Sequence, residues 1–257
     1  MIPEFFLDLV TALGWQACLL APLSILLGYV IFGMVGFGAT LINVPLLAQF
    51  LPLRFVLPLT LALDLSAAVM VGSGFRGQAD RAELRRMLPF VFLGMALGLA
   101  LLFNLPERVL LVLLGVFVLY AGISSLARRT NAAAIRTGWA MPAGIAGGIF
   151  SALYGTGGPI YTIYLSRRIA DKTVFRATMA TLILTVSLTR LAMFAISGLL
   201  LQDHLLLAAL LLTPFVALGL ALGNRLHHRL SGPRIMRMVF VLIVANGAAL
   251  IARALQG

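Results

Sequence analysis

Residues 36–45 read Gly-Phe-Gly-Ala-Thr-Leu-Ile-Asn-Val-Pro, and residues 155–159 read Gly-Thr-Gly-Gly-Pro. Both glycine-rich stretches interrupt apolar runs that would otherwise form helices long enough to cross a bilayer. Backbone N–H and C=O groups without partners are costly in hydrocarbon, so such a break persists only inside protein or beside a water-filled cavity. The sequence therefore predicts two broken membrane segments with other helices packed around them.

The chain of 257 residues is too apolar for a domain surrounded by water. Hydrophobic residues make up 61% and charged residues only 11%, whereas a soluble domain is about a quarter charged. The apolar residues come in runs of about 20, the length of a membrane-spanning helix, and they lack the alternation of barrel strands. The net charge of +11 lies in short clusters between these runs, so no nucleic-acid partner is expected.

The apolar runs and their breakers predict an all-α integral membrane protein with about eight transmembrane helices, two of them interrupted and re-entrant. The first set covers about 14–35 with a short resumption to 52, then 55–75, 87–104 and 108–127. The second set covers about 138–154 with a resumption to 166, then 175–198, 205–223 and 234–254. The same order of elements occurs twice, which predicts two four-helix repeats, residues 1–130 and 131–257.

Glycines at matching positions support the repeat. Gly36 and Gly38 precede Gly155 and Gly157 by 119 residues, and Gly94 and Gly98 precede Gly219 and Gly223 by 125. The alternative is an irregular helix bundle in which glycines match by accident.

The basic residues orient the chain in the membrane. Fifteen of the 19 lie in four loops, after the second and fourth predicted spans, before the sixth, and between the seventh and eighth. The positive-inside rule places these loops in the cytoplasm. We therefore expect a multi-pass protein of the bacterial inner membrane with both termini in the periplasm. In that topology the loop after the second span is inside and its counterpart after the sixth is outside, so the repeats are inverted.

The two breaks are the expected substrate site. In inverted-repeat transporters such breaks meet near the midplane, and the N-termini of half-helices direct their positive dipole ends at an anionic substrate. The candidate substrate-binding residues are Gly36, Phe37, Gly38, Thr40, Asn43, Tyr154, Gly155, Thr156, Gly157, Gly158 and Arg190. The alternative is that the glycines of the breaks only permit close helix packing.

Two charged residues lie in the interior of the predicted spans, away from the span ends: Asp64 and Arg190. Charges inside a membrane are costly and usually pair or serve function. We expect Arg190 to neutralise the anion, because a guanidinium group can bind the oxygens of an anion bidentately. Asp64 is expected to hold Arg190 or to carry a coupling proton or other ion. The alternatives are that Arg190 extends to the outer interface and that Asp64 is a structural partner or a neutral, hydrogen-bonded acid.

The break from Gly36-Phe37-Gly38 through Pro45, the second break and the four-plus-four layout resemble the TauE/SafE family over about residues 20–252. The resemblance implies a bacterial permease for the export or uptake of sulfite, sulfonates and related small organosulfur anions. Members of that family often carry a fuller Gly-Gly-Gly run in each half. Here Ala39 and Thr40 occupy that place in the first half and Pro159 ends the second, which leaves the substrate within this class open.

The expected function is that of a secondary transporter, surrounded by membrane lipid, which moves a small anion by alternating access. The anion would be sulfite, a sulfonate or a related organosulfur or carboxylate anion. The sequence has no Gly-Lys-Ser/Thr, no His-Glu-x-x-His and no cysteine pair, so we expect no enzyme, metal or cofactor. An uncoupled anion channel, or a membrane subunit without transport activity, is the alternative. The sequence does not indicate an oligomeric state.

Overall fold

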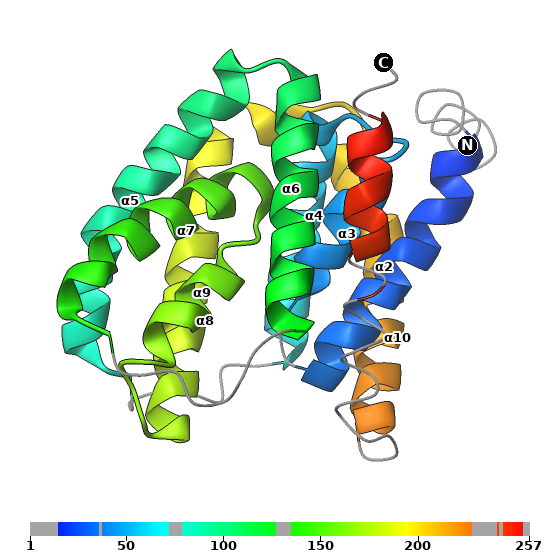
Figure 1. The fold of residues 1–257 in the computed structure, drawn as a ribbon. Coiled ribbons are helices and arrows are strands. Elements are labelled where there is room, and N and C mark those ends of the chain that lie inside the picture. Colours follow the sequence, from blue (N-terminus) through cyan, green and yellow to red (C-terminus); the bar gives the residue numbers. More distant parts are fainter. Residues whose placement is uncertain are drawn as a thin grey trace. The chain divides into compact units, whose positions relative to one another are not determined.

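The computed structural model describes residues 15–35, 38–71, 79–126, 135–227, 241 and 244–253. Within these ranges the ordered elements are α-helices and short 3-10 helices, and no strand occurs (Figure 1). Four of the described helices are long and apolar enough to cross a membrane, and a shorter apolar helical segment covers Leu19–Met34. The prediction of an all-α membrane protein is confirmed for this part of the chain.

The helices follow the predicted spans to within a few residues at most ends. In the first half they are α2 (Trp15–Val35), α3 (Ala39–Leu47), α4 (Leu53–Val71), α5 (Arg81–Asn104) and α6 (Glu107–Leu126). In the second half they are η1 (Thr137–Trp139), α7 (Ala140–Tyr154), α8 (Gly158–Leu165), α9 (Lys172–Ile196), η2 (Leu199–Leu201) and α10 (Leu205–His227). A further helical segment covers 244–253.

The largest difference from the predicted boundaries is the start of α5, at Arg81 rather than 87. Asp80 caps this helix: its Oδ1 accepts hydrogen bonds from the N–H groups of Ala82 (2.9 Å) and Glu83 (3.0 Å). Such a cap satisfies N–H groups that have no partner within the helix. Helix α5 therefore extends into the basic loop, beyond the apolar run that hydropathy detects.

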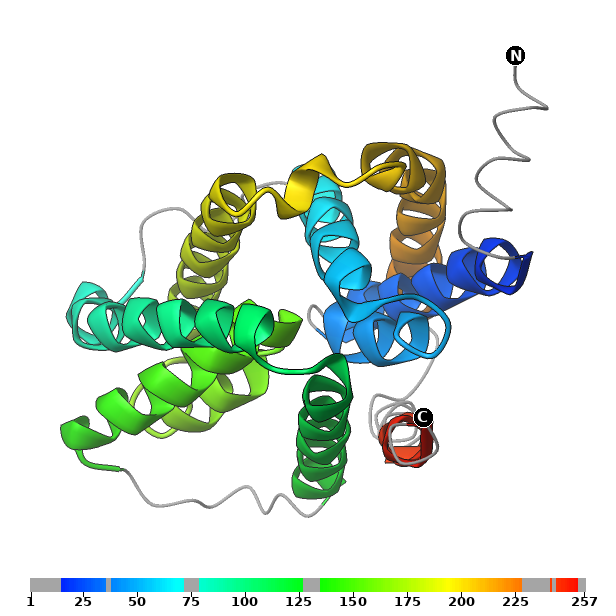
Figure 2. The same cartoon turned by 90° about the horizontal axis from the view of Figure 1, so that it is seen from above.

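The chain forms two compact units, and each draws helices from both predicted repeats. The first unit holds α2, α3, α4, α6, η2, α10 and 244–253. The second unit holds α5, η1, α7, α8 and α9. Figure 2 shows the same elements from above. The interrupted segment of each predicted repeat therefore shares a unit with the third predicted span of the other repeat, which is α10 for the first segment and α5 for the second.

In the second unit, glycines bring α5 and α7 into close contact (Figure 1). A Cβ atom on Gly94 would overlap the carbonyl oxygen of Ile145, and one on Gly98 would lie 2.7 Å from that of Ile149. From the other side, a Cβ atom on Gly148 would overlap the carbonyl oxygen of Val91. Only glycine permits the two backbones to approach this closely.

A matching glycine contact joins α10 and α2 in the first unit. A Cβ atom on Gly219 would lie 2.9 Å from the carbonyl oxygen of Leu26, and one on Gly223 would overlap that of Val30. Leu26 and Val30 precede Ile145 and Ile149 by 119 residues. The glycine pairs matched in the sequence thus make matching contacts, and packing accounts for these glycines.

Candidate substrate and ion sites at the helix breaks

The break in the second unit begins where α7 ends, at Tyr154. Gly155 follows with a φ of +69°, in the left-handed region that glycine adopts without strain. Its N–H donates to the carbonyl oxygen of Ser151 at 2.9 Å. Helix α8 then starts at Gly158 with Pro159 in its first turn, where the missing proline N–H costs no helical hydrogen bond. A break at the predicted glycines is therefore observed.

Helix α8 folds back onto α7, so the two form a hairpin. A Cβ atom on Gly147 would overlap the ring of Tyr161, and one on Gly157 would overlap Oγ of Ser151. The hydroxyl groups of Ser151 and Tyr161 share a hydrogen bond of 3.0 Å. Gly147 and Gly157 are thus explained by packing inside the α7–α8 hairpin.

Two features of this break are not explained by packing. Thr156 is 3% exposed, and its Oγ1 has no hydrogen-bond partner among the described residues. A Cβ atom on Gly158 would meet nothing within 4 Å, so open space adjoins the first residue of α8. Buried hydroxyl groups are nearly always hydrogen-bonded, so the Thr156 hydroxyl is available to bond a group that does not belong to the described residues.

Arg190 lies on α9 of the same unit and is 3% exposed. It belongs to a buried stripe at intervals of four residues, Thr178, Leu182, Val186, Arg190 and Phe194. The guanidinium carbon lies 5.2 Å from the ring centroid of Phe194, within the range of a cation–π interaction. An arginine that reached for the lipid interface would expose its guanidinium group, so this burial argues against that alternative.

The break in the first unit follows α2. Gly36 and Phe37 lie outside the described residues, whereas Gly38 has a φ of +97° and precedes α3. An added Cβ atom on Gly38 would meet nothing within 4 Å, so the backbone conformation and not packing requires glycine there. Seven of the nine residues of α3 are buried. This half-helix therefore meets the requirement that a broken segment be sheltered by protein.

Helix α3 folds back onto α2 through Asn43, which lies over Gly28. A Cβ atom on Gly28 would lie 2.5 Å from Cγ of Asn43 and 2.6 Å from its Nδ2. Gly28 precedes Gly147 by 119 residues, so both hairpins close over a glycine at the matching position. Asn43 is 1% exposed, and its Oδ1 accepts no hydrogen bond from any described residue.

Asp64, on α4, joins both arms of the α2–α3 hairpin. Its Oδ1 accepts a hydrogen bond from the hydroxyl of Tyr29 at 2.7 Å, and its Oδ2 accepts one from Oγ1 of Thr40 at 2.8 Å. Both of these partners lie in the first unit. That Asp64 holds Arg190 stays a prediction. The sequence reasoning did not identify Tyr29, because a tyrosine inside an apolar run carries no signal of its own.

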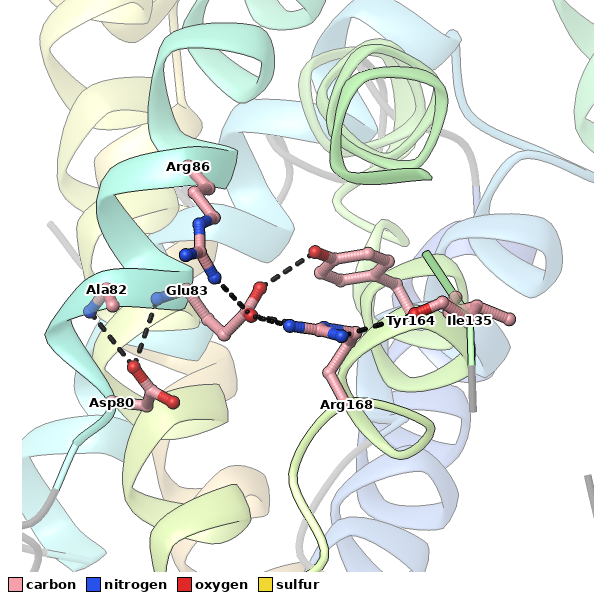
Figure 3. A network of polar contacts seen from close by, with 7 residues as sticks. All are labelled: Asp80, Ala82, Glu83, Arg86, Ile135, Tyr164 and Arg168. Atoms are coloured by element: carbon pink, nitrogen blue, oxygen red, sulfur yellow. Dashed lines mark hydrogen bonds and ion pairs between the residues drawn. The ribbon is translucent and has the colours of Figure 1, made fainter. Parts of the chain in front are cut away.

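A second group missed by the sequence reasoning is Glu83, whose carboxylate is buried near the start of α5 (Figure 3). Its Oε1 accepts from Arg168, through Nε at 3.1 Å and an Nη atom at 2.8 Å, and from Arg86 at 2.8 Å. Its Oε2 accepts from the hydroxyl of Tyr164 at 2.7 Å. The hydrogen bonds to Glu83 raise the pKa of Arg168 above its ordinary value, so that side chain stays charged.

This network fastens the C-terminal end of α8 to α5. Tyr164 is in the last turn of α8 and Arg168 follows it, while Glu83 is in the first turn of α5. The signal in the sequence was a single acid among the arginines of Arg81-Ala82-Glu83-Leu84-Arg85-Arg86. The positive-inside argument uses only the basic residues of this loop and passes over the acid. One acid surrounded by bases indicates a local ion pair.

Comparison with known proteins identifies the family. The model of the family described as sulfite exporter TauE/SafE matches residues 20–250. The chain belongs to the TauE/SafE family. It is therefore a membrane transporter of the TauE/SafE type, and the resemblance noted from the two breaks is confirmed.

The TauE/SafE chain is also similar to the probable inner membrane transporter protein TsaS of Comamonas testosteroni. The two are 29% identical over 194 residues, which cover 75% of this chain and 81% of the relative. No solved structure matches the chain.

Proposed function

We propose that this TauE/SafE protein is a secondary carrier of the bacterial inner membrane that moves a small anion by alternating access. The anion is sulfite, a sulfonate or a related organosulfur or carboxylate anion, in keeping with the family description. The observation that carries the proposal is the break in the α7–α8 hairpin, where the buried Thr156 hydroxyl has no partner among the described residues and open space adjoins Gly158.

The chemistry of this break suits an anion. The first turn of α8 presents backbone N–H groups at the positive end of a helix dipole. The Thr156 hydroxyl can donate a further hydrogen bond. Arg190, on α9 of the same unit, supplies the positive charge that offsets the cost of removing an anion from water. Tyr154, Gly155, Gly157 and Gly158 shape the surrounding backbone. In this proposal a coupling ion binds at the first break, near Asp64.

The test of carrier function is counterflow of labelled sulfite or sulfonate in proteoliposomes. Wild-type protein is expected to give saturable exchange. The variant Arg190→Gln is expected to lower the exchange rate by at least about 30-fold, because buried charge-assisted contacts are worth about 2–5 kcal/mol. The control is Arg176→Gln, which removes an exposed arginine from the same helix. Exchange that survives Arg190→Gln unchanged would remove Arg190 from the site, and flux that neither saturates nor exchanges would indicate a pore.

We also propose the topology of two inverted repeats, residues 1–130 and 131–257, with about eight spans and periplasmic termini. It is supported by the positions of the basic loops and by the matching glycine contacts of α5 with α7 and of α10 with α2. In a chain whose Cys18 is replaced by serine, Asp203→Cys is expected to react with an impermeant maleimide on intact cells. Ala170→Cys is expected to react only after permeabilisation. The reverse pattern would overturn the topology.

A further inference from the structure

A pocket opens at the start of α7, where the chain passes from a basic loop into an apolar helix. It is lined by Arg136, Gly138, Trp139 and Pro142 and has a volume of about 230 Å³. An added Cβ atom on Gly138 would meet nothing within 4 Å, so the glycine keeps this space open. None of the lining residues belongs to either helix break. The pocket is therefore distinct from the proposed anion site.

The wall of this pocket changes from charged to apolar along the chain. Arg136 is exposed, and Trp139 is 58% exposed. Further into α7, Met141 and Pro142 are exposed as well. Tryptophan is enriched where headgroups meet hydrocarbon, because its ring is apolar while its N–H can donate a hydrogen bond. Arginine, tryptophan and apolar residues follow the order of layers that a helix meets as it enters a bilayer.

The backbone of this loop is fixed, whereas the side chain of Arg136 reaches solvent. The carbonyl oxygen of Arg136 accepts from the N–H of Trp139 at 3.1 Å. The carbonyl oxygen of the preceding residue, Ile135, accepts from an Nη atom of Arg168 at 3.3 Å. Arg168 is itself held by the buried carboxylate of Glu83. The guanidinium group of Arg136 is therefore presented to the surface from a fixed position in the chain.

Four helix ends meet at this end of the second unit. The N–H of Asp80, before α5, donates to Oγ1 of Thr178 on α9 at 2.9 Å. Glu83, in the first turn of α5, binds Arg168, which follows α8 (Figure 3). Arg168 in turn bonds Ile135, which precedes α7. The charged residues of these four helix ends therefore lie at the same end of the unit.

Positive charge is in excess among these residues. The described residues of the four helix ends include three acids, Asp80, Glu83 and Asp171, and eight bases, Arg81, Arg85, Arg86, Arg136, Arg167, Arg168, Lys172 and Arg176. Basic clusters next to membrane helices attract anionic lipid headgroups. The excess of bases therefore brings anionic lipid to this end of the unit, and the pocket offers one headgroup a defined position.

We propose that this pocket binds the headgroup of an anionic phospholipid. Arg136 offers positive charge and N–H groups to the lipid phosphate, and Trp139 lies at the level of the glycerol backbone. The acyl chains then continue over the exposed surface of Met141 and Pro142. This apolar surface favours a lipid over a free phosphate ion, and the excess of bases favours an anionic lipid over a zwitterionic one. The site does not depend on what the protein transports.

The test uses the purified full-length protein in a non-ionic detergent. Thermal unfolding is measured against increasing phosphatidylglycerol, with phosphatidylcholine and sodium phosphate as separate arms. A ligand that binds only the folded state raises Tm by mass action. Wild-type protein is expected to show a saturable rise in Tm with phosphatidylglycerol that exceeds the rise in either other arm. An equal rise with phosphatidylcholine, or with inorganic phosphate, would overturn the proposal.

Matched variants separate the pocket from the general charge of this end. Arg136→Gln is expected to raise the phosphatidylglycerol concentration for half-maximal stabilisation about tenfold, as loss of one hydrogen bond to a charged group predicts. The control is Arg85→Gln, which removes the same charge from an exposed position on α5. Arg85 lies about half a turn from Met87, whose carbonyl oxygen faces Gly144 of α7. Equal effects of the two variants would mean that the lipid responds only to net charge, which contradicts the pocket.

A third variant fills the pocket without a change of charge. Gly138→Leu places a side chain in the space that the glycine leaves open, so we expect it to abolish the preference for phosphatidylglycerol over phosphatidylcholine. A wild-type lipid response in Gly138→Leu would contradict the site. If Gly138→Leu does not fold, Arg136→Gln against Arg85→Gln decides the question, because both arginines are exposed and surface substitutions rarely unfold a protein.

Discussion

The α2–α3 and α7–α8 hairpins share a backbone plan but differ in the chemistry of their side chains. In each, the returning half-helix packs over a glycine, Gly28 or Gly147, and the entering half-helix packs against a long helix through a pair of glycines. The first hairpin bonds the carboxylate of Asp64. The unit of the second contains the buried guanidinium group of Arg190.

Close backbone packing and the charge of the buried side chains can therefore vary independently in the two units. Close packing needs glycine wherever a Cβ atom would strike a carbonyl oxygen, and this requirement recurs in both units. The side chains that face the breaks are not under that steric constraint. The side chains of the two units can therefore differ: hydroxyl groups of the first hairpin bond a carboxylate, and the unit of the second hairpin buries a guanidinium group.

The largest expected effect is a loss of stability when the glycine contacts that both units share are disrupted. Gly94→Ala in the second unit and Gly223→Ala in the first each place a methyl group on a carbonyl oxygen of the neighbouring helix. We expect each to lower the free energy of unfolding by about 3 kcal/mol, since overpacking against backbone cannot be relieved by a rotamer change. Thermal unfolding in detergent measures the loss.

The control for these variants is Gly138→Ala, where an added Cβ atom meets nothing within 4 Å. Similar losses for Gly94→Ala and Gly223→Ala support equivalent crossings. A large loss at one position and none at the other would contradict the matching of α5 with α10.

A smaller loss of stability is expected when the contacts that hold the C-terminal ends of α8 and α3 are removed. The end of α8 is held by Glu83, whereas the residue after α3, Ala48, accepts a hydrogen bond through its carbonyl oxygen from Arg253. We expect Glu83→Ala to cost about 2–3 kcal/mol, because it leaves Arg168 without its buried carboxylate. Arg253→Ala, which removes one hydrogen bond, is expected to cost about 1 kcal/mol.

Arg86→Ala serves as the control for the Glu83 network. Arg86 is 48% exposed in its side chain and pairs with Glu83 along one helix, so its loss is expected to cost under about 0.5 kcal/mol. Chemical unfolding followed by tryptophan fluorescence gives the order of the three variants. If Glu83→Ala proves as mild as Arg86→Ala, the network does not anchor α8.

Hydropathy and glycine placement predicted the helices and both breaks, because each depends on short stretches of neighbouring residues. The same information could not predict the exchange of α5 and α10 between the repeats, which depends on contacts between distant segments. It also missed Glu83, whose partner Arg168 is distant in the sequence. Arg190 and Asp64 were singled out by charge alone, but the hydroxyl partners of Asp64 depend on how α2 and α3 fold back.

A third prediction separates packing from ligand binding within one break. Gly157→Ala is expected to cost about 1–3 kcal/mol of stability, because its methyl group would overlap Oγ of Ser151. Gly158→Ala faces open space, so its stability should change by less than about 0.5 kcal/mol.

The methyl group of Gly158→Ala would instead occupy volume next to the proposed anion. A screen of Tm against sulfite, taurine-like sulfonates, sulfoacetate and carboxylates is expected to show a weakened anion response in Gly158→Ala. An undiminished response would move the anion away from α8.

The smallest expected effect tests the unpartnered hydroxyl of Thr156. Valine has nearly the same shape, and a buried polar group without a partner is a cost that Thr156→Val removes. We therefore expect stability to be unchanged or to rise by up to about 1 kcal/mol, while the anion concentration for half-maximal stabilisation rises about tenfold, the loss of one hydrogen bond. Thr181→Val is the control, because its hydroxyl bonds the carbonyl oxygen of Ala177 on its own helix. A destabilised Thr156→Val with an unaltered anion response would mean that the hydroxyl serves the fold. A stable variant with a weakened anion response would instead mean that the Thr156 hydroxyl donates its hydrogen bond to the anion and not to the protein.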